Sequence, residues 1–287
     1  MQYPDSMASG RRDGTQLETR VGAVAMIDAL GFRGIWSRYP DEDVVEKLRS
    51  LAEVAASEAR ALQEGARSHG GNLLEFVQPM ALSDTVVLGV ATKPLDAVAR
   101  GLQAEGWGEI IKFDDATLAG EAVRLCAELL GALVRRALEE PVPLAYRGAI
   151  AFGRFGMADR FIVGPAIDEA AEWMERPEGA IVMLAPSAAQ YPQAQVPSAA
   201  SNLFHTEVPM SPKRCQAPMV QTWALAPFAG IHDPLRRQLH ENCVASFGQS
   251  PTGSIAQKLA NTQAFLAAAD LAESSLLRSL LEQARRP

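Results

Sequence analysis

Two apolar, β-branched runs that each carry a single carboxylate constrain this chain more than any other feature of its sequence. One run covers 21–28 and ends at Asp28, and the other begins at Asp84 and continues as Thr-Val-Val-Leu. Runs of this composition are typical of buried strands. An isolated carboxylate in apolar surroundings is costly, or its pKa shifts. Two such aspartates at strand ends therefore indicate a shared cation, and with it an enzyme.

Composition and charge limit the class of protein. The 287 residues are 48% hydrophobic and 21% charged, which is typical of a soluble globular protein with one large domain or two small ones. The net charge of −7 and the absence of a basic run argue against a nucleic-acid partner. The first residues do not resemble a secretion signal, and no apolar run near them could span a bilayer, so we expect no membrane partner. Three scattered cysteines fit a reducing cytoplasm, where we expect the protein to act: Cys126, Cys215 and Cys243.

Hydrophobic periodicity predicts an α+β fold with a mostly antiparallel sheet flanked by helices. We expect a flexible tail over 1–19, a main domain over 20–228 and a C-terminal helical extension over 229–287 packed on the same domain. Residues 78–81 are expected to form a turn or bulge between two strands, and 92–116 a surface excursion. The expected strands are 21–28, 73–77, 84–90, 144–152, 160–163, 180–184, 203–208 and 219–225; the expected helices are 41–65, 118–139, 167–175 and 254–286, with a helical turn from Pro186.

The two aspartates can be interpreted together. If their strands are sheet neighbours, both carboxylates lie at one edge and can hold divalent cations through oxygen atoms. Two cations would activate a hydroxyl nucleophile and neutralise a triphosphate. The glycine-containing turn after Asp28 would direct main-chain amides toward phosphate oxygens. Taken alone, Asp28 could cap a turn and Asp84 could be a hairpin residue, but together with the glycine turn they favour a metal site.

Four segments occur in the order found in class III nucleotidyl cyclases, which the chain resembles over about 21–226. They are the Ile-Asp-Ala-Leu-Gly-Phe turn, the Ser-Asp hairpin, the Arg-Gly-Ala-Ile-Ala-Phe-Gly strand and the Gly-Pro-Ala-Ile-Asp helix start, at 27–32, 83–84, 147–153 and 164–168. The resemblance implies a ferredoxin-like core and a homodimer with active sites at the interface. It also implies two Mn²⁺ or Mg²⁺ ions per site. By the same resemblance, Asp28, Asp84 and the backbone of Ala29 bind metal, and Leu30, Gly31, Phe32 and Arg33 bind the β- and γ-phosphates.

The chain departs from purine cyclases of this family at the positions that read the base. A Lys and an Asp are expected there, but this sequence has Met80 and Phe161, which cannot form charge-assisted hydrogen bonds to a purine edge. The Asn and Arg that assist the transition state correspond to Asp168 and Glu172. An acidic pair cannot offset developing phosphate charge. The domain is therefore either catalytically silent or specific for another base.

The chain also resembles the pyrimidine cyclases of the bacterial Pycsar anti-phage system. That resemblance implies conversion of UTP, or alternatively CTP, to a cyclic nucleotide that activates a separate effector protein. A smaller base would suit a site lined by Met80 and Phe161, with the Gln78 amide matching a uracil or cytosine edge. UTP is favoured by family frequency. A purine cyclase and a silent nucleotide-binding dimerisation module remain alternatives.

Three basic residues are further candidates. Arg33 could clamp a terminal phosphate or be a solvated helix residue. Arg147 could point into the cleft or form a structural ion pair. Lys213 is near the position at which the family has a phosphate-binding Lys, or is a solvated loop charge. The four histidines are dispersed and share no metal-binding spacing, so we expect none to be catalytic: His69, His205, His232 and His240.

Overall fold

One mixed sheet organises the molecule. The computed structural model describes residues 18–68, 73–104, 114–158, 161–191 and 202–284. The strand order is β2-β3-β1-β4-β6-β8-β7, with β5 paired to β4, and every pairing is antiparallel except β4 with β6. This confirms the predicted α+β class with a mostly antiparallel sheet. The strands are β1 (Thr19–Ala29), β2 (Leu74–Leu82), β3 (Thr85–Thr92), β4 (Tyr146–Ala158), β5 (Phe161–Val163), β6 (Val182–Leu184), β7 (Leu203–Pro209) and β8 (Met219–Leu225).

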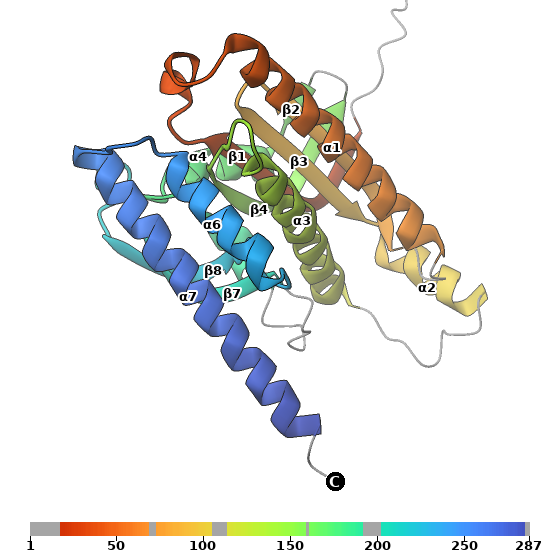
Figure 1. Ribbon diagram of the computed structural model, residues 1–287. Helices are drawn as coiled ribbons and strands as arrows, with labels where there is room; N and C mark the ends of the chain where they lie inside the picture. The colour runs from red at the N-terminus through yellow and green to blue at the C-terminus, as the bar shows by residue number, and fades with distance from the viewer. Residues whose placement is uncertain (1–17, 69–72, 105–113, 159–160, 192–201, 285–287) are drawn as a thin grey trace, which may run out of the picture.

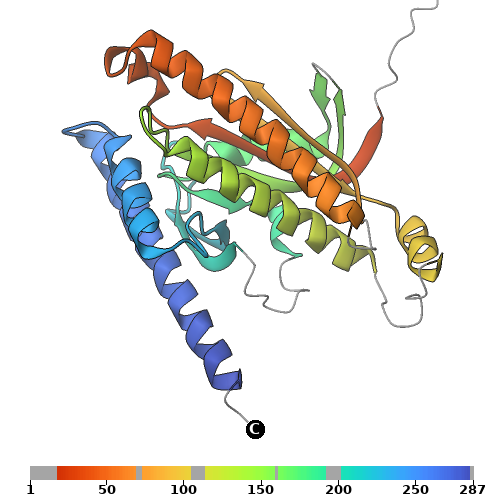
Figure 2. The same cartoon turned by 45° about the vertical axis from the view of Figure 1, so that its right-hand side comes forward.

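The first half of the chain forms a β-α-β-β-α-β unit. Its order in the sheet, β2-β3-β1-β4, with α1 and α3 as the two long connecting helices, is the ferredoxin-like arrangement. Figures 1 and 2 show α1 and α3 lying side by side across one face of this sheet. The helices are η1 (Phe32–Ser37), α1 (Asp41–Ser68), α2 (Leu95–Ala104), α3 (Asp115–Ala137), α4 (Pro165–Met174), α5 (Pro186–Ala189), α6 (Asp233–Ala245) and α7 (Gly253–Ala284).

Strand β1 is apolar on both sides because both faces of the sheet are covered around it. Ala25 and Ile27 belong to the core cluster beneath α1 and α3, whereas Val24 belongs to a second cluster that includes residues of α4 on the opposite face. Successive side chains of a strand point to opposite faces, so a strand covered on both sides has no polar alternation. Asp28, at the end of this run, is the exception.

The C-terminal helices form a third core. Phe265 and Leu266 of α7 pack with Leu239 and Cys243 of α6 and with Met183 of β6. In Figure 1, α7 crosses the β7–β8 end of the sheet, and its last turns project beyond it. Helix α6 was not predicted. The assignment of 20–228 and 229–287 as a domain and its extension stays a prediction.

One local expectation is wrong. The turn expected over 78–81 is part of β2, which accommodates Pro79 because β2 is an edge strand and needs no ladder N–H on its outer side. The turn lies instead at Ser83 and Asp84, between Leu82 and Thr85. The excursion over 92–116 contains α2, and 105–113 lie outside the described residues.

Some sequence expectations cannot be compared with the structure. The predicted tail over 1–19 lies outside the described residues except for its last two positions, and so does His69. Within the part of the chain that the structure describes, no helix is long and apolar enough to cross a membrane.

Candidate active site

Asp28 lies near the end of β1, the strand between β3 and β4 in the sheet. It pairs with Thr85 of β3 on one side and with Arg147 of β4 on the other. The approach of β4 is close: a Cβ at Gly148 would lie 2.3 Å from the Met26 carbonyl oxygen and 2.5–2.9 Å from atoms of Ile27. Only glycine fits at that point, so the Arg-Gly sequence places Arg147 beside Asp28.

Asp84 reaches the same end of the sheet through the β2–β3 turn. Ser83 has a φ of 59°, in the left-handed region, so the turn reverses the chain in two residues. The Ala29 amide donates a hydrogen bond to the Asp84 carbonyl oxygen over 3.2 Å. The condition set by the sequence analysis, that the two strands be sheet neighbours, is met, because β1 pairs with β3.

The two carboxylates interact unfavourably. The pKa of Asp28 is raised, first by burial and then by the negative charge of Asp84, with Glu175 adding to the effect. Arg147 and the Thr85 hydroxyl lower this pKa, but they do not outweigh the other causes. Thr85 Oγ1 donates to Asp28 Oδ1 over 3.3 Å, and Arg147 Nη2 lies 3.7 Å from Asp28 Oδ2. Negative charge at this site is therefore only partly compensated.

The donor set fits a divalent cation. The negative charge of Asp84 helps to raise the pKa of Asp28, and a bound cation would offset this repulsion. Carboxylate oxygens are ligands that suit Mg²⁺ and Mn²⁺. The Tyr146 hydroxyl is buried without a hydrogen-bond partner, and burial, Asp84 and Asp28 raise its pKa. Among the described residues, no three His, Cys, Asp or Glu side chains are grouped to hold a metal. A cation at Asp28 and Asp84 would therefore need further ligands from the main chain, water or substrate.

Arg147 forms an ion pair with Asp28, which agrees with one of the two roles that the sequence left open for it. Besides Asp28, its Nη1 donates to the Glu175 carbonyl oxygen over 3.3 Å. The Glu175 side chain pairs in turn with Arg214 of the β7–β8 connection. Lys213, the predicted residue of this connection, is exposed. No spacing in the sequence connects Glu175 with Arg214, because they come from segments that meet only in the folded chain.

The segment Leu30–Arg33, which we call the Gly31 turn, follows Ala29, the last residue of β1. Gly31 has a φ of 71°, a conformation that disfavours other residues. The Leu30 amide is bound to the Ala145 carbonyl oxygen over 2.8 Å and is not available to a phosphate. Phe32 and Arg33 open η1, where Phe32 is partly buried and Arg33 is exposed.

The structure does not bring the three predicted base-reading residues to one surface of this chain. Gln78 is partly buried on β2, and Met80, which is 9% exposed, belongs to the core cluster near α4. Ile162 of β5 packs against that cluster, whereas the preceding Phe161 is 68% exposed. Adjacent strand residues point to opposite faces, so Phe161 lies away from Met80.

The helix α4 carries the two acidic residues that depart from the cyclase pattern. Asp168 and Glu172 are both exposed. Glu172 pairs with Arg176 one turn further along, and the Arg176 guanidinium lies 4.0 Å from the centre of the Trp173 ring. The spacing of four residues between Glu172 and Arg176 is a signal that the sequence analysis missed.

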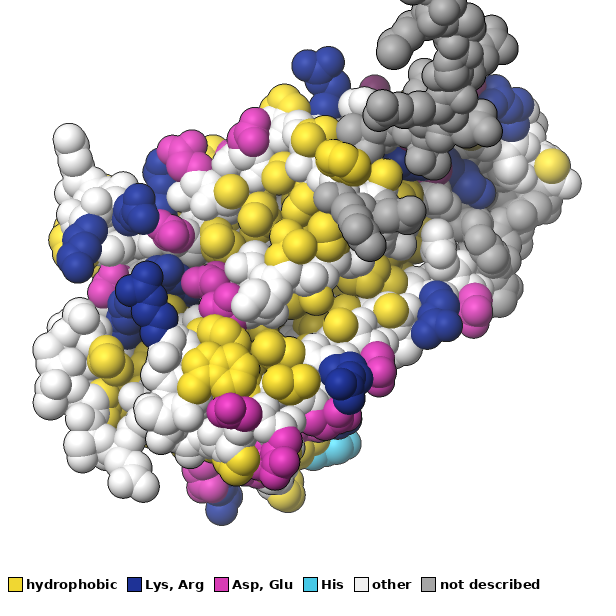
Figure 3. Space-filling model, turned by 90° about the horizontal axis from the view of Figure 1, so that it is seen from above, with side chains coloured by type: hydrophobic (Ala, Val, Ile, Leu, Met, Phe, Trp, Pro, Cys, Tyr) yellow, Lys and Arg dark blue, Asp and Glu magenta, His cyan; other side chains and the backbone are white. Residues whose placement is uncertain are grey.

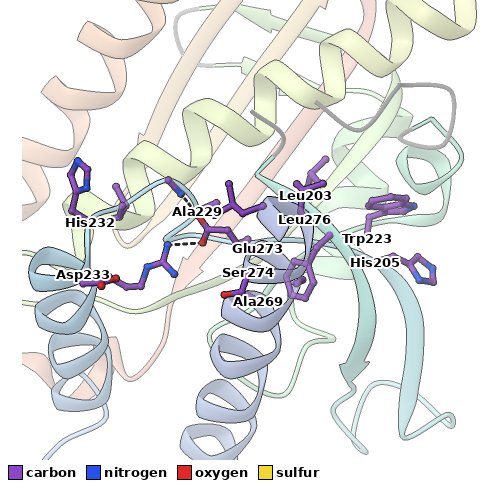
Figure 4. Close-up of a pocket in the computed structure, with 17 residues that line it drawn as sticks. Leu203, His205, Trp223, Ala229, His232, Asp233, Ala269, Glu273, Ser274 and Leu276 are labelled. Carbon is purple, nitrogen blue, oxygen red and sulfur yellow. Dashed lines mark hydrogen bonds and ion pairs between the residues drawn. The ribbon is translucent and has the colours of Figure 1, made fainter. Parts of the chain in front are cut away.

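A separate cavity of about 700 Å³ lies between β7, β8, α6 and α7 (Figure 4). Neither Asp28 nor Asp84 lines it. Figure 4 shows Glu273 linked to a neighbouring guanidinium, and this is Arg236, which also pairs with Asp270. The second Glu273 oxygen accepts from the Gly230 amide. Arg236 contacts its two carboxylates at 3.3 and 2.5 Å, more closely than Arg147 contacts Asp28.

Comparison with known proteins gives a fold likeness only. No protein-family model matches the chain, and no curated protein does. Similar solved structures include the catalytic core of a rhodopsin-guanylyl cyclase with converted specificity in complex with ATPalphaS, at 12% identity and a TM-score of 0.42, covering 74% of this chain and 98% of that one. A bacterial light-regulated adenylyl cyclase matches at 13% identity and a TM-score of 0.36, covering 79% and 59% of the two chains. An adenylate/guanylate cyclase/hydrolase from Silicibacter pomeroyi matches at 17% and 0.38, covering 72% and 97%. Likenesses this distant carry no argument about activity, which has to be argued from the residues of the site.

Proposed function

We propose that this protein is a pyrimidine nucleotide cyclase that converts UTP to 3′,5′-cyclic UMP and pyrophosphate in the cytoplasm. The observation that carries the proposal is the pair Asp28 and Asp84, which meet at one end of the sheet with their negative charge only partly compensated. The ribose 3′-oxygen forms a bond to the α-phosphorus, the bond from that phosphorus to the pyrophosphate oxygen breaks, and the 3′-hydroxyl proton is released. Divalent metal bound at the aspartates would lower the pKa of the hydroxyl and neutralise the triphosphate.

The chain's own residues have separate roles in this proposal. Asp28 and Asp84 hold Mn²⁺ or Mg²⁺, with the backbone of Ala29 as a further ligand. The Gly31 turn binds the phosphates. Arg147 lies beside Asp28 and holds its carboxylate in place when no substrate is bound.

Specificity for a pyrimidine is supported by what the base-reading positions lack. Met80 and Phe161 offer no charged hydrogen-bonding group, and Gln78 offers a single amide. Because Phe161 is exposed on its own chain, it would contribute to a base site only together with a second chain. CTP is the alternative substrate, followed by a purine nucleotide.

We propose that the active form is a homodimer with its sites at the interface. Exposed apolar side chains, among them Leu82, Phe161 and Val163, support a covered face. Figure 3 shows hydrophobic side chains gathered over the middle of the face seen from above, with acidic and basic side chains beside them.

The cyclic product would activate a separate effector protein in defence against phage, a role suggested by the resemblance to the Pycsar cyclases.

The test is direct. The purified protein is incubated with each of the four nucleoside triphosphates and Mn²⁺, and the products are separated by chromatography and identified by mass spectrometry. Cyclic UMP as the main product supports the proposal, cyclic CMP selects the alternative substrate, and cyclic AMP or cyclic GMP selects a purine cyclase. Absence of any cyclic product would overturn the assignment.

A silent nucleotide-binding module is the second candidate. It is favoured by the acidic, exposed Asp168 and Glu172 on α4. The ion pair between Asp28 and Arg147 also favours it, because Asp28 then already has a positively charged partner. Metal-dependent binding of a triphosphate, measured by calorimetry, without turnover would select this candidate.

A further inference from the structure

Arg38 connects two segments that are far apart in the sequence. Its Nη1 donates to the Ser246 carbonyl oxygen over 2.7 Å, and its Nη2 donates to the Gly31 carbonyl oxygen over 3.3 Å. Ser246 is the residue at which α6 ends. One planar guanidinium therefore joins the Gly31 turn to the C-terminal extension.

The α6 end of this connection is firmly held. Ser246 is 3% exposed, and its amide and its hydroxyl donate to the carbonyl oxygens of Asn242 and Cys243. The buried Asn242 side chain donates to the Leu138 carbonyl oxygen over 2.8 Å, at the end of α3. The positive charge of Arg38 at the last carbonyls of α6 is favourable to that helix.

The Gly31 end is held by fewer contacts. Gly31 begins η1 without any side-chain cap, and its carbonyl oxygen accepts the Gly34 amide over 3.1 Å. Upstream, the turn is fixed at Leu30 by Ala145. Arg38 is the side chain that ties the Gly31 carbonyl to a second element.

We propose that Arg38 is a positioning residue for the Gly31 turn, and that the end of α6 is thereby part of the triphosphate-binding apparatus. This inference rests on the proposed function, in which the Gly31 turn binds the phosphates. Arg38 itself touches no reacting atom. It fixes the turn against α6, whose own end is fixed to α3, so the turn is preformed when substrate arrives.

A structural role alone would lower stability without a selective effect on substrate. A positioning role predicts a selective effect: loss of Arg38 raises the KM for the triphosphate, while the Mn²⁺ concentration for half-maximal activity is unchanged because Asp28 and Asp84 are not disturbed. Arg38→Lys would not restore the wild-type KM. A guanidinium donates to the Gly31 and Ser246 carbonyl oxygens from two separate nitrogen atoms, whereas an ammonium group has only one.

The experiment compares the full-length wild type with Arg38→Ala, Arg38→Lys and a control, Arg49→Ala. Arg49 lies on α1, is 61% exposed in its side chain and pairs only with Glu46 in the contacts described, so it matches Arg38 in charge and size but not in position. Two readouts are used: steady-state kinetics with the preferred triphosphate, and hydrogen–deuterium exchange of peptides covering 29–39.

We expect Arg38→Ala to raise KM about tenfold and to accelerate amide exchange in 29–39 by a similar factor, with Arg49→Ala unchanged. Unchanged exchange and unchanged KM in Arg38→Ala would overturn the inference, and so would faster exchange with an unchanged KM. If Arg38→Ala does not fold, Arg38→Lys decides by the same two readouts.

The inference and the proposed function can fail separately. If the wild type forms no cyclic nucleotide, the proposed cyclase activity fails, and calorimetric binding of the triphosphate replaces KM. Weaker binding by Arg38→Ala with faster exchange then still supports the positioning role, whereas unchanged binding overturns it.

Discussion

Two groups of charged side chains in this molecule, one at Asp28 and one at Arg236, differ in how well their charges are compensated. At Asp28 the nearest guanidinium atom is 3.7 Å away, and burial together with Asp84 raises the pKa. At Arg236, one guanidinium pairs with two carboxylates, of Asp270 and Glu273. The difference indicates that the loosely paired charges at Asp28 are open to a ligand, whereas the close pairing at Arg236 holds α6 to α7.

The strongest test of this comparison removes the uncompensated charge. Asp28→Asn or Asp84→Asn should lower the proposed cyclase activity by about a thousandfold or more, because either change would remove a proposed metal ligand. The melting temperature should stay the same or rise for Asp28→Asn, since the raised pKa shows that the folded state disfavours the charged form. Activity assays and thermal melting measure the two effects.

The matched control is Asp96→Asn. Asp96 is an exposed aspartate on α2 whose partner is Arg100. We expect wild-type activity from it. A marked loss of stability in Asp28→Asn, with activity retained, would contradict the assignment of this group to a site.

The compensated group should respond in the opposite way. Arg236→Met leaves Asp270 and Glu273 without their shared partner, and we expect a loss of about 1–3 kcal/mol in the free energy of unfolding. Cyclase activity at a temperature well below the melting point should be unchanged. Urea denaturation measures the loss, with the exposed neighbour Arg237→Met as control. A change in activity without a change in stability would give this region a role in the site.

Lys47 shows that a shifted pKa does not by itself mark a site. It is buried, donates to the carbonyl oxygens of Arg136 and Glu139 over 2.9 and 2.6 Å, and burial lowers its pKa from 10.5 to about 8. The charges of Glu139 and Glu140 oppose this shift, and that of Arg136 adds to it. The folded protein therefore releases this proton at a lower pH than the unfolded chain.

The consequence is a pH-dependent stability. Between about pH 8 and pH 10.5 the unfolded state binds more protons, so the free energy of unfolding should rise with pH, by on the order of 1–2 kcal/mol. Lys47→Met should abolish this rise, and Lys213→Met, at an exposed loop position, should keep it. Denaturation curves across the pH range provide the measurement. An identical pH dependence in Lys47→Met would contradict the assignment.

The smallest effect is expected at Arg147. Its contacts with Asp28 and with the Glu175 carbonyl are long, at 3.7 and 3.3 Å, and long contacts contribute little, so Arg147→Gln should lower the free energy of unfolding by about 1 kcal/mol or less. This is less than the loss at Arg236, where the same residue type is better paired. Urea denaturation measures both variants. If Arg147→Gln lowers the free energy of unfolding as much as Arg236→Met or more, the Asp28 and Arg236 groups do not differ in how closely their charges are paired.

Much of the architecture was predictable because local sequence patterns report burial. The run that leads to Asp28 is apolar, which correctly indicated a buried strand. The pair β7 and β8 was also predicted. Residues 78–81 were assigned wrongly because Pro79 usually ends a strand, and only the position of β2 at the sheet edge makes it acceptable.

For the site, the sequence identified the residue types but not their partners. Asp28 and Asp84 were found as costly charges in apolar surroundings. Thr85 and Tyr146 were missed although they adjoin Asp84 and Arg147 in the sequence. Arg38 had no detectable signal, because its partner Ser246 is more than two hundred positions away.

The sequence by itself determined where most of the strands and the long helices α1, α3 and α7 form and which two carboxylates lie at strand ends, since these depend on neighbouring residues and on the period of the apolar positions. Only the tertiary structure decided that Arg147 lies against Asp28, that Glu175 meets Arg214, and that Arg38 connects the Gly31 turn to α6. It also decided that Phe161 is exposed while Met80 is buried. These outcomes depend on strand order, register and helix docking, which bring together residues that no local pattern relates.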